Sequence, residues 1–267
     1  MIKKFLITHP KLNPFNYSPE KIIRLMTSSI RSKPTFLIVG VQKCGTSIVY
    51  DYICQHPKIK QSYPKKIERV FGKYTEEIAY HASNYPILKN DEITGDVRQD
   101  YSFLPDAAEN LKKILPNVKP IFILRDPVQR TISHYNMNKH ANNETLSLEK
   151  ALAVENDRIS GEWEKIKKNP NHNRRVLWNY SYKTKSMYVN YIPEWIEIFP
   201  DTLIIKFEEF LKNPQKTLSK IFSLLKVEDY KIKIEPYKYK IYKNQELENF
   251  FAPYNKKLNE VLGKKFY

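Results

Sequence analysis

The sequence predicts a single α/β domain in which a central parallel sheet is flanked by helices. Apolar, β-rich runs alternate along the chain with helical patterns, as in sheets whose parallel strands are joined by crossover helices. A chain of 267 residues is long enough to bury a full core in one domain. No internal repeat or interdomain linker divides it. We therefore expect a helical N-terminal extension over residues 1–33 and one domain over residues 34–267.

Three apolar runs supply the expected buried strands. They are PTFLIVGV at 34–41, KPIFILRDP at 119–127 and DTLIIKF at 201–207, with EITGDV at 92–97 as a shorter candidate. Continuous apolar runs of this length are typical of strands that are covered on both faces of a sheet. The segment 58–90 is a polar region between the first two strand–helix units.

Helical patterns follow these strands. In residues 46–57, apolar side chains at positions 48, 49, 52 and 53 form one helical face, and Pro57 ends the pattern. Asp126 is a good helix cap and Pro127 a good first-turn residue, so a helix is expected to follow the strand that ends there. Two further helices are expected, over 188–200 with Pro193 near its start or kinking it, and over 213–227 with a cap at Asn213. The polar stretch 141–185 is predicted to be an irregular, substrate-facing loop.

Charge is the unusual feature of the composition, because 45 Lys and Arg against 29 Asp and Glu give a net charge of +16. Such an excess favours anionic partners, although lysines spread over solvated faces give the same number. A basic domain that binds nucleic acid would leave the two phosphate motifs described below unexplained. The basic segment 20–33 predicts a helix packed on its own domain, with a peripheral membrane contact as the alternative.

The cysteines and the N-terminus bear on the compartment. Cys44 and Cys54 form neither a disulfide framework nor a metal-binding spacing, which favours a reducing compartment and a protein without a metal. The apolar run at the start is too short for a signal peptide or a membrane span. We therefore expect a soluble, cytoplasmic protein.

The octapeptide GVQKCGTS at 40–47 lies between the first strand and its helix, where α/β sheets bind anions. A nucleoside-triphosphate loop reads G-x-x-x-x-G-K-[ST], but here Gly45 is followed by Thr46 and the lysine comes earlier, at Lys43. Backbone N–H groups of residues 43–47, with the hydroxyls of Thr46 and Ser47, are suited to wrap one phosphate. No strand of the kind that ends in a magnesium-binding aspartate is evident. The loop predicts a 5′-phosphate donor that is handled without a metal.

A matching feature follows the second strand. Arg125 ends that strand, and Ser133 lies two turns into the next helix. A bidentate arginine and a hydroxyl that converge there are suited to grip a second phosphate. A nucleotide with phosphates at both ends of its ribose needs both of these sites.

These residues resemble the sulfotransferases that use 3′-phosphoadenosine 5′-phosphosulfate (PAPS). IVGVQKCGTSIVYDYICQHPKI (38–59) is similar to their 5′-phosphosulfate loop and FILRDPVQRTISHYNM (122–137) to their 3′-phosphate motif. The resemblance covers most of residues 34 to 263 and is closest to the heparan-sulfate-type and bacterial carbohydrate sulfotransferases. It implies a sheet of the P-loop-kinase-like type. Animal members are membrane-anchored, and this chain resembles a soluble bacterial enzyme.

The resemblance also implies roles for individual residues. Lys43 is expected to neutralise charge on the departing phosphate, and the displaced lysine then serves the bond between phosphate and sulfuryl group. Cys44, Gly45, Thr46 and Ser47 are expected to bind the 5′-phosphate. Arg125 and Ser133 are expected to bind the 3′-phosphate.

The general base is less clear in the pattern. Relatives place a Lys-Glu pair about ten residues after the HP that ends the first helix, and here HPKIKQSYPKKIERVFG (56–72) puts Lys66 at the glutamate position. A two-residue shift makes the base Glu68, with Phe71 as the following aromatic residue. Asp96 is the next carboxylate, and His81 and His134 are weaker candidates. The sequence therefore leaves Glu68 and Asp96 as alternative bases.

One further residue and one further segment are expected to contact ligands. Arg98 stands where relatives carry a small residue, and we expect it to read an acidic acceptor. The segment DYKIKIEPYKYKIYKN (229–244) either closes over the adenine or 3′-phosphate, with Lys240 and Tyr242 as the contacts, or forms a solvated hairpin.

The predicted function is sulfuryl transfer from PAPS, as co-substrate, to a hydroxyl or amine of an acceptor, favoured to be an acidic glycan. Two alternatives stay open: an ATP-dependent small-molecule kinase, and a nucleotide-binding protein that has lost its activity. The kinase would require magnesium, which the missing Gly-Lys-[ST] sequence argues against.

Overall fold

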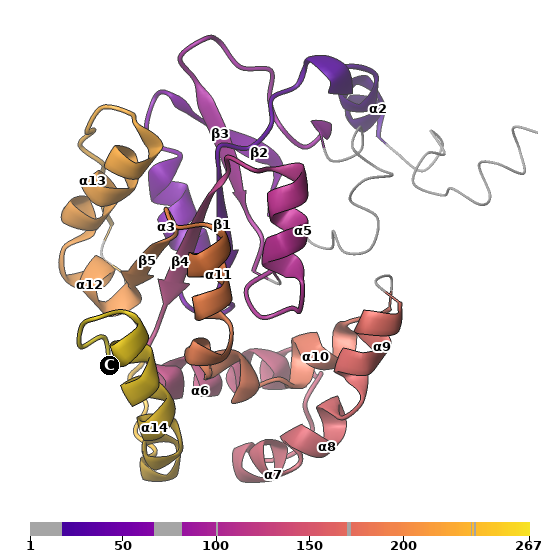
Figure 1. Ribbon diagram of the computed structural model, residues 1–267, viewed down its shortest axis with the longest axis vertical. Coiled ribbons are helices and arrows are strands. Elements are labelled where there is room, and N and C mark those ends of the chain that lie inside the picture. Colours follow the sequence, from indigo (N-terminus) through magenta and orange to yellow (C-terminus); the bar gives the residue numbers. More distant parts are fainter. Residues whose placement is uncertain (1–17, 67–81, 100, 170–171, 236, 238) are drawn as a thin grey trace, which may run out of the picture.

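Figure 1 shows a computed structural model of the chain, with a five-stranded parallel sheet at the centre of one α/β domain. The structure describes residues 18–66, 82–99, 101–169, 172–235, 237 and 239–267. The strands are β1 (Phe36–Gly40), β2 (Ile59–Lys66), β3 (Ile93–Val97), β4 (Lys119–Leu124) and β5 (Leu203–Lys206). Their spatial order is β2-β3-β1-β4-β5, and every neighbouring pair is parallel. This confirms the predicted fold class.

The middle of the sheet carries the most apolar strands. All five residues of β1 are buried, and β4 is buried after its first residue. Ile38 of β1 pairs with Val97 of β3 on one side and with Ile121 of β4 on the other, so these strands end near one another. Loops that follow neighbouring parallel strands meet at the carboxyl edge of the sheet, where α/β proteins bind ligands. The two predicted phosphate motifs begin at that edge.

Helices cover both faces of the sheet. On one face α5 (Ala107–Ile114) packs with α11 (Ile192–Ile198), and on the other α3 (Thr46–Ile53) packs with α13 (Pro214–Leu225). Each presents an apolar side to the core; on α13 that side consists of Leu218, Ile221, Phe222 and Leu225. The helix expected over 188–200 is shorter, and Pro193 lies in the first turn of α11, near its start as expected. α13 starts at Pro214 as predicted, but the Asn213 side chain makes no capping hydrogen bond.

A further group of helices lies beyond the carboxyl edge of the sheet, in the lower part of Figure 1. It starts with α6 (Pro127–His140), which follows β4 and is capped by the Asp126 side chain as expected. Its other members are α7 (Leu148–Ala153), α8 (Glu155–Ile159), α9 (Glu162–Lys168), α10 (Arg175–Tyr180) and α14 (Gln245–Val261). The prediction of an irregular loop over 141–185 was therefore wrong. Helices of five to seven residues leave too few apolar repeats for a helical period to be visible in the sequence.

Two strands differ from the sequence predictions, and both are edge strands. β2 arises from the region expected to be only polar; Ile59 and Ser62 are buried while Gln61 and Tyr63 face outward. β5 was predicted as buried, yet only Ile205 of its four residues is fully buried. An edge strand has a neighbouring strand on one side only and is more exposed than a central strand, so it needs fewer apolar residues. Its composition is therefore a weak guide to its place in the sheet.

The N-terminal part of the described chain forms a short helix, α2 (Pro19–Met26), and a 3₁₀ turn, η3 (Ser28–Ile30). Lys21 donates to the hydroxyl of Ser83 at 2.6 Å, while Arg24 and Arg31 donate to the carbonyl of Tyr85. These bonds hold the segment against the domain, as the first alternative for 20–33 expected. Within the part of the chain that the structure describes, no helix combines the length and apolar character needed to cross a membrane.

Candidate active site

The phosphate loop joins β1 to α3 and is shaped by Gly45. This glycine is the N-cap residue of α3, with a φ of 81° and no side chain capping the helix. A Cβ built on it would overlap the ring of Phe207, so both the backbone angle and the space require glycine. Thr46 and Ser47 are the first residues of α3, and their backbone N–H groups therefore have no acceptor within the helix. These groups, with the helix dipole, suit the loop to bind an anion.

The side chains of the loop point in different directions. Lys43 is half-buried at a φ of 72°, while Cys44 is fully buried with its sulfur 3.6 Å from the Tyr188 hydroxyl. Burial raises the pKa of the Cys44 thiol to about 11, so it stays protonated at neutral pH. Only the backbone of Cys44 is therefore suited to bind a phosphate. The Thr46 hydroxyl accepts a hydrogen bond from the Gln99 amide, which fixes its orientation.

The second phosphate motif meets the first at the carboxyl edge of the sheet. Arg125 follows β4, and its Nη1 donates to the Lys43 carbonyl at 3.4 Å. The turn after it is held by the Glu208 carboxylate, which accepts the backbone N–H of Asp126 at 2.9 Å. Ser133 is half-buried on α6, two turns further on. The structure thus brings Lys43 and Arg125 together and places Ser133 on the helix that starts beside them.

Two buried cations lie behind the loop, and the sequence predictions missed both. Arg130 is 0% exposed and donates to the Gln42 carbonyl (3.4 Å) and the Ser186 hydroxyl (2.6 Å). Lys185 is 1% exposed and donates from Nζ to the Gln42 side-chain oxygen at 2.9 Å. Both therefore add positive charge beside the phosphate loop in a region of low dielectric. Arg130 could have been found from the sequence, because it lies one helical turn after Asp126 at the start of α6. No feature of the sequence near Lys185 indicates that it lies beside the loop.

His134, one of the weaker base candidates, is a structural residue of this cluster. It is fully buried, with Nδ1 accepting from Arg130 (3.2 Å) and Nε2 facing the carbonyl of Trp178 at 3.1 Å. An arginine only donates, so Nδ1 is the acceptor and Nε2 carries the proton. Burial and the charges of Lys185 and Arg130 lower the pKa of His134 well below its usual value. Its ring therefore has no nitrogen left to take a proton from an acceptor.

Of the two carboxylates proposed as the base, Asp96 is buried within the fold. It is fully buried at the end of β3, with Arg98 Nε 3.1 Å from both of its oxygens and the Tyr85 hydroxyl 2.6 Å from one. Burial raises the pKa of Asp96, and the charge of Arg98 opposes that rise. Both carboxylate oxygens accept hydrogen bonds from Arg98 or Tyr85, so Asp96 is a structural partner of Arg98. The prediction of Asp96 as an alternative base is therefore wrong.

The remaining base candidates lie outside the described residues or at their limit. Glu68, Phe71 and His81 lie outside the described residues, and Lys66 is described only as the last residue of β2.

Arg98 was expected to read an acidic acceptor, but it is buried against Asp96 and over the Tyr101 ring. That expectation is wrong, because a buried guanidinium paired with a carboxylate cannot reach an acceptor in solution.

Comparison with known proteins decides the family. A family model described as the sulfotransferase domain matches residues 33–260. The chain belongs to the sulfotransferase family. A sulfotransferase of solved structure from Alicyclobacillus acidocaldarius is 26% identical, with a TM-score of 0.67 over 88% of this chain and 98% of that chain. The five-stranded parallel sheet described above is thus the P-loop-kinase-like sheet of a sulfotransferase.

Curated relatives match parts of the sulfotransferase domain. The membrane-associated sulfotransferase kil1 of Dictyostelium discoideum is 32% identical over 39% of this chain and 23% of its own length. The bifunctional heparan sulfate N-deacetylase/N-sulfotransferase 1 of Caenorhabditis elegans is 24% identical over 75% of this chain and 23% of its own length. The human heparan sulfate glucosamine 3-O-sulfotransferase 6 is 31% identical over 39% of this chain and 30% of its own length. The chain spans less than a third of each of these relatives.

A cavity of about 440 Å³ lies on the α12 (Phe207–Lys212) side of the candidate site. Its lining includes Glu208 and the aromatic rings of Tyr52, Tyr237 and Tyr239. The Arg125 guanidinium lies 5.9 Å from the centre of the Tyr239 ring, so this cavity adjoins the second phosphate motif. We call it the donor-side cavity.

The segment 229–244 runs past this cavity and onto α6, and its described residues form no strand, so the hairpin alternative is not observed. Gln129 exchanges two hydrogen bonds with the backbone of Tyr242, and Asn136 donates to the Tyr242 hydroxyl at 3.1 Å. Gln129, Ser133 and Asn136 share one face of α6 by their spacing. The segment is therefore anchored on both sides of Ser133. Lys240 is exposed next to that anchor, with Nζ 5.5 Å from the centre of the Tyr242 ring.

Proposed function

We propose that this protein transfers a sulfuryl group from PAPS to a hydroxyl or amine of a carbohydrate acceptor. The observation that carries the proposal is the contact of Arg125 with the Lys43 carbonyl, since it joins the two phosphate motifs in one site. Four cations, Lys43, Arg125, Arg130 and Lys185, lie at or behind this edge of the sheet. A donor with phosphate groups at the 5′ and 3′ positions matches two adjoining anion sites better than a triphosphate does.

The residues assign a simple sequence of events to the transfer. The acceptor oxygen or nitrogen attacks sulfur as the bond between sulfur and the bridging phosphate oxygen breaks, and adenosine 3′,5′-bisphosphate leaves. Lys43 stabilises the charge that grows on that phosphate, while the N–H groups of Thr46 and Ser47 hold it in place. A carboxylate takes the acceptor proton, and Glu68 is the candidate we carry forward. Ser133, Arg125 and the exposed Lys240 are proposed to hold the 3′-phosphate.

The adenosine part is proposed to occupy the donor-side cavity. Its aromatic lining offers the flat apolar surface that a nucleobase prefers, and Arg125 lies at its border. The heparan sulfate sulfotransferases among the relatives support a glycan as the acceptor.

A calorimetric titration with adenosine 3′,5′-bisphosphate tests the donor assignment. We expect saturable binding that does not change when magnesium is added, and no comparable binding of ATP. Among the described residues no group of three or more His, Cys, Asp or Glu is placed to hold a metal ion. Tight ATP binding that needs magnesium would instead support the kinase.

Arg125→Ala in the same titration should weaken binding of the bisphosphate by about 1.5–3 kcal/mol, the value of a charge-assisted hydrogen bond. Lys220→Ala, on the exposed side of α13, removes the same charge away from the site and should leave the affinity unchanged. Equal losses in the two variants would show that only net charge matters and would remove Arg125 from the donor site.

Single-turnover rates with PAPS test the base. Glu68→Gln keeps the size of the side chain and removes the base, so we expect a loss of about 10²–10⁴ in rate. Asp96→Asn should instead lower stability, because Arg98 would lose its buried charge partner. A folded Asp96→Asn protein should keep most of its rate. A full rate in Glu68→Gln would dismiss Glu68 as the base.

A further inference from the structure

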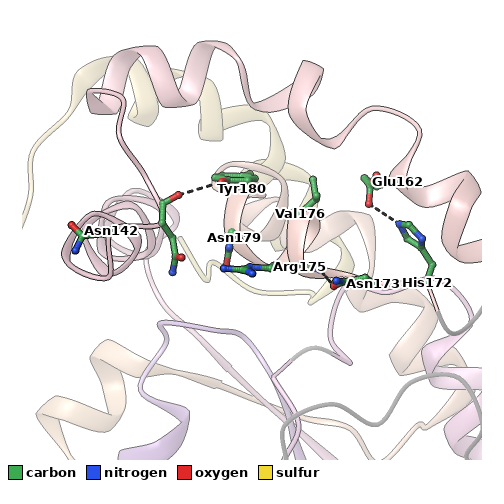
Figure 2. Close-up of a pocket in the computed structure, with 9 residues that line it drawn as sticks. Asn142, Glu162, His172, Asn173, Arg175, Val176, Asn179 and Tyr180 are labelled. Atoms are coloured by element: carbon green, nitrogen blue, oxygen red, sulfur yellow. Dashed lines mark hydrogen bonds and ion pairs between the residues drawn. The ribbon is translucent and has the colours of Figure 1, made fainter.

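A second cavity, of about 540 Å³, lies in the group of helices beyond the carboxyl edge of the sheet (Figure 2). Its walls come from the turn that follows α6, from α9 and from α10 with the residues before it. The volume is within the range of roughly 300–1,000 Å³ found for small-molecule sites. We call it the amide cavity, because four asparagines line it: Asn142, Asn143, Asn173 and Asn179.

The amide cavity offers hydrogen bonds across its length. Figure 2 shows the side chains spread from Asn142 at one end to the pair of Glu162 and His172 at the other. An asparagine side chain both donates and accepts, as does a sugar hydroxyl, so a row of amides can bind hydroxyl groups of either orientation. Val176 and the Tyr180 ring supply apolar surface between the polar groups. Such a mixture of amides and an aromatic ring suits a carbohydrate.

The charge of the amide cavity differs from that of the whole chain. The Glu162 carboxylate, which is largely buried, accepts from Lys165 (2.7 Å) and faces His172 Nε2 at 3.0 Å. Burial favours the neutral acid, but the hydrogen bonds from Lys165 and His172 and their charges outweigh burial, so the pKa of Glu162 is lowered. Its negative charge is thus balanced locally. Arg175 is exposed, and among the described residues no carboxylate pairs with its guanidinium. Among the described residues that line the cavity, Arg175 is therefore the one arginine or lysine, in a protein of net charge +16.

The amide cavity is coupled to the phosphate loop by α10. Lys185 Nζ donates both to the Trp178 carbonyl in α10 (2.8 Å) and to the Gln42 side chain in the loop (2.9 Å). The next residue, Asn179, lines the cavity, and its carbonyl accepts from Asn138 of α6. Lys185 therefore links a wall of the cavity directly to the loop that is proposed to hold the donor phosphate.

We propose that the amide cavity binds the acceptor as a glycan chain with hydroxyl or acetamido groups and sparse carboxylates, one of which pairs with Arg175. The inference rests on the proposed function, and it makes that function narrower. A chain already rich in sulfate would find a single guanidinium and the nearby Glu162 carboxylate, so it fits this cavity poorly. The acceptor that fits is then a glycan chain that carries few sulfate or carboxylate groups.

The test compares three tetrasaccharides by calorimetry with the full chain, in the presence of saturating adenosine 3′,5′-bisphosphate. The probes are an unsulfated tetrasaccharide of alternating glucuronic acid and N-acetylglucosamine, the uncharged tetramer of N-acetylglucosamine, and a fully sulfated heparin tetrasaccharide. We expect the first to bind best at physiological salt. Binding of the heparin fragment should fall steeply with salt, as expected of exposed charges.

Two variants separate a specific site from general charge. Arg175→Ala should weaken binding of the uronate tetrasaccharide about tenfold to a hundredfold, and should abolish its advantage over the neutral tetramer. Lys168→Ala removes an exposed cation of α9 that does not line the cavity and should change neither. Asn173→Ala, also at an exposed position, should weaken both the charged and the neutral tetrasaccharide. Thermal unfolding of each variant checks that the fold is intact.

The results of these titrations test the acceptor site and the donor site separately. Normal binding of the bisphosphate with no binding of the uronate tetrasaccharide would overturn the acceptor assignment and leave the donor assignment standing. Equal effects of Arg175→Ala and Lys168→Ala would also overturn it. Tetrasaccharide binding that depends on Arg175 in a protein that fails to bind the bisphosphate would support a glycan site while refuting the sulfotransferase donor.

Discussion

Lys43→Ala is expected to reduce turnover by about 10²–10³, the loss typical when one preorganised charge or donor is removed from a developing anion. Its ammonium belongs to the loop that is proposed to hold the 5′-phosphate, and its carbonyl is fixed by Arg125. The lysine interacts most strongly when the bridging oxygen becomes negative. Turnover should therefore fall more than the affinity for adenosine 3′,5′-bisphosphate. Both quantities are measured on one preparation, with turnover followed as release of the bisphosphate from PAPS.

Lys43→Met is the matched variant, since it keeps the length of the side chain and the backbone strain at a φ of 72° while removing the charge. A similar loss in both variants would assign the effect to the charge. Near-normal turnover in Lys43→Met would contradict the proposed role, and would reduce Lys43 to a residue that shapes the loop.

The sequence predicts the central sheet, which the structure confirms, and it shows both candidate phosphate motifs, because those features are local. Continuous apolar runs such as FLIVG and KPIFIL are needed in strands buried on both faces, and they are visible without knowledge of the fold. The displaced lysine and the Asp126-Pro127 helix start are also written in a few adjacent residues. These parts of the prediction depend on short-range chemistry alone.

The parts that were missed depend on contacts between distant segments. Lys185 and Gln42 are 143 residues apart, and only the packing of the helices beyond the sheet brings them together. The sequence leaves Asp96 as an alternative base because it does not show that Arg98 and Tyr85 enclose the carboxylate. The edge strand β2 and the short helices α7 to α10 have too few residues to show a period. Burial and partners, which decide whether a carboxylate is catalytic or structural, are properties of the fold.

Gly45→Ala should both destabilise the protein and abolish binding of the donor at its phosphate loop. An L-residue in the left-handed region costs about 1–2 kcal/mol, and a methyl group forced against a packed ring costs roughly 1–3 kcal/mol more. The methyl group would overlap Phe207, which in turn lies under the Arg125 guanidinium at 5.9 Å. Relief of the overlap must therefore move the loop or the ring, and either movement disturbs both phosphate motifs at once.

Gly161→Ala separates these two costs, because Gly161 has a similar φ of 71° but no heavy atom within 4 Å of its missing Cβ. Chemical denaturation should give a loss of about 1–2 kcal/mol for Gly161→Ala, the backbone term alone, and a larger loss for Gly45→Ala. The bisphosphate affinity should be unchanged in Gly161→Ala. Replacement of Phe207 by Leu in the Gly45→Ala background should recover part of the lost stability, since it removes the ring that the methyl group meets. If the two glycine variants lost equal stability and Gly45→Ala still bound the bisphosphate normally, the close approach of Phe207 would not be what shapes the phosphate loop.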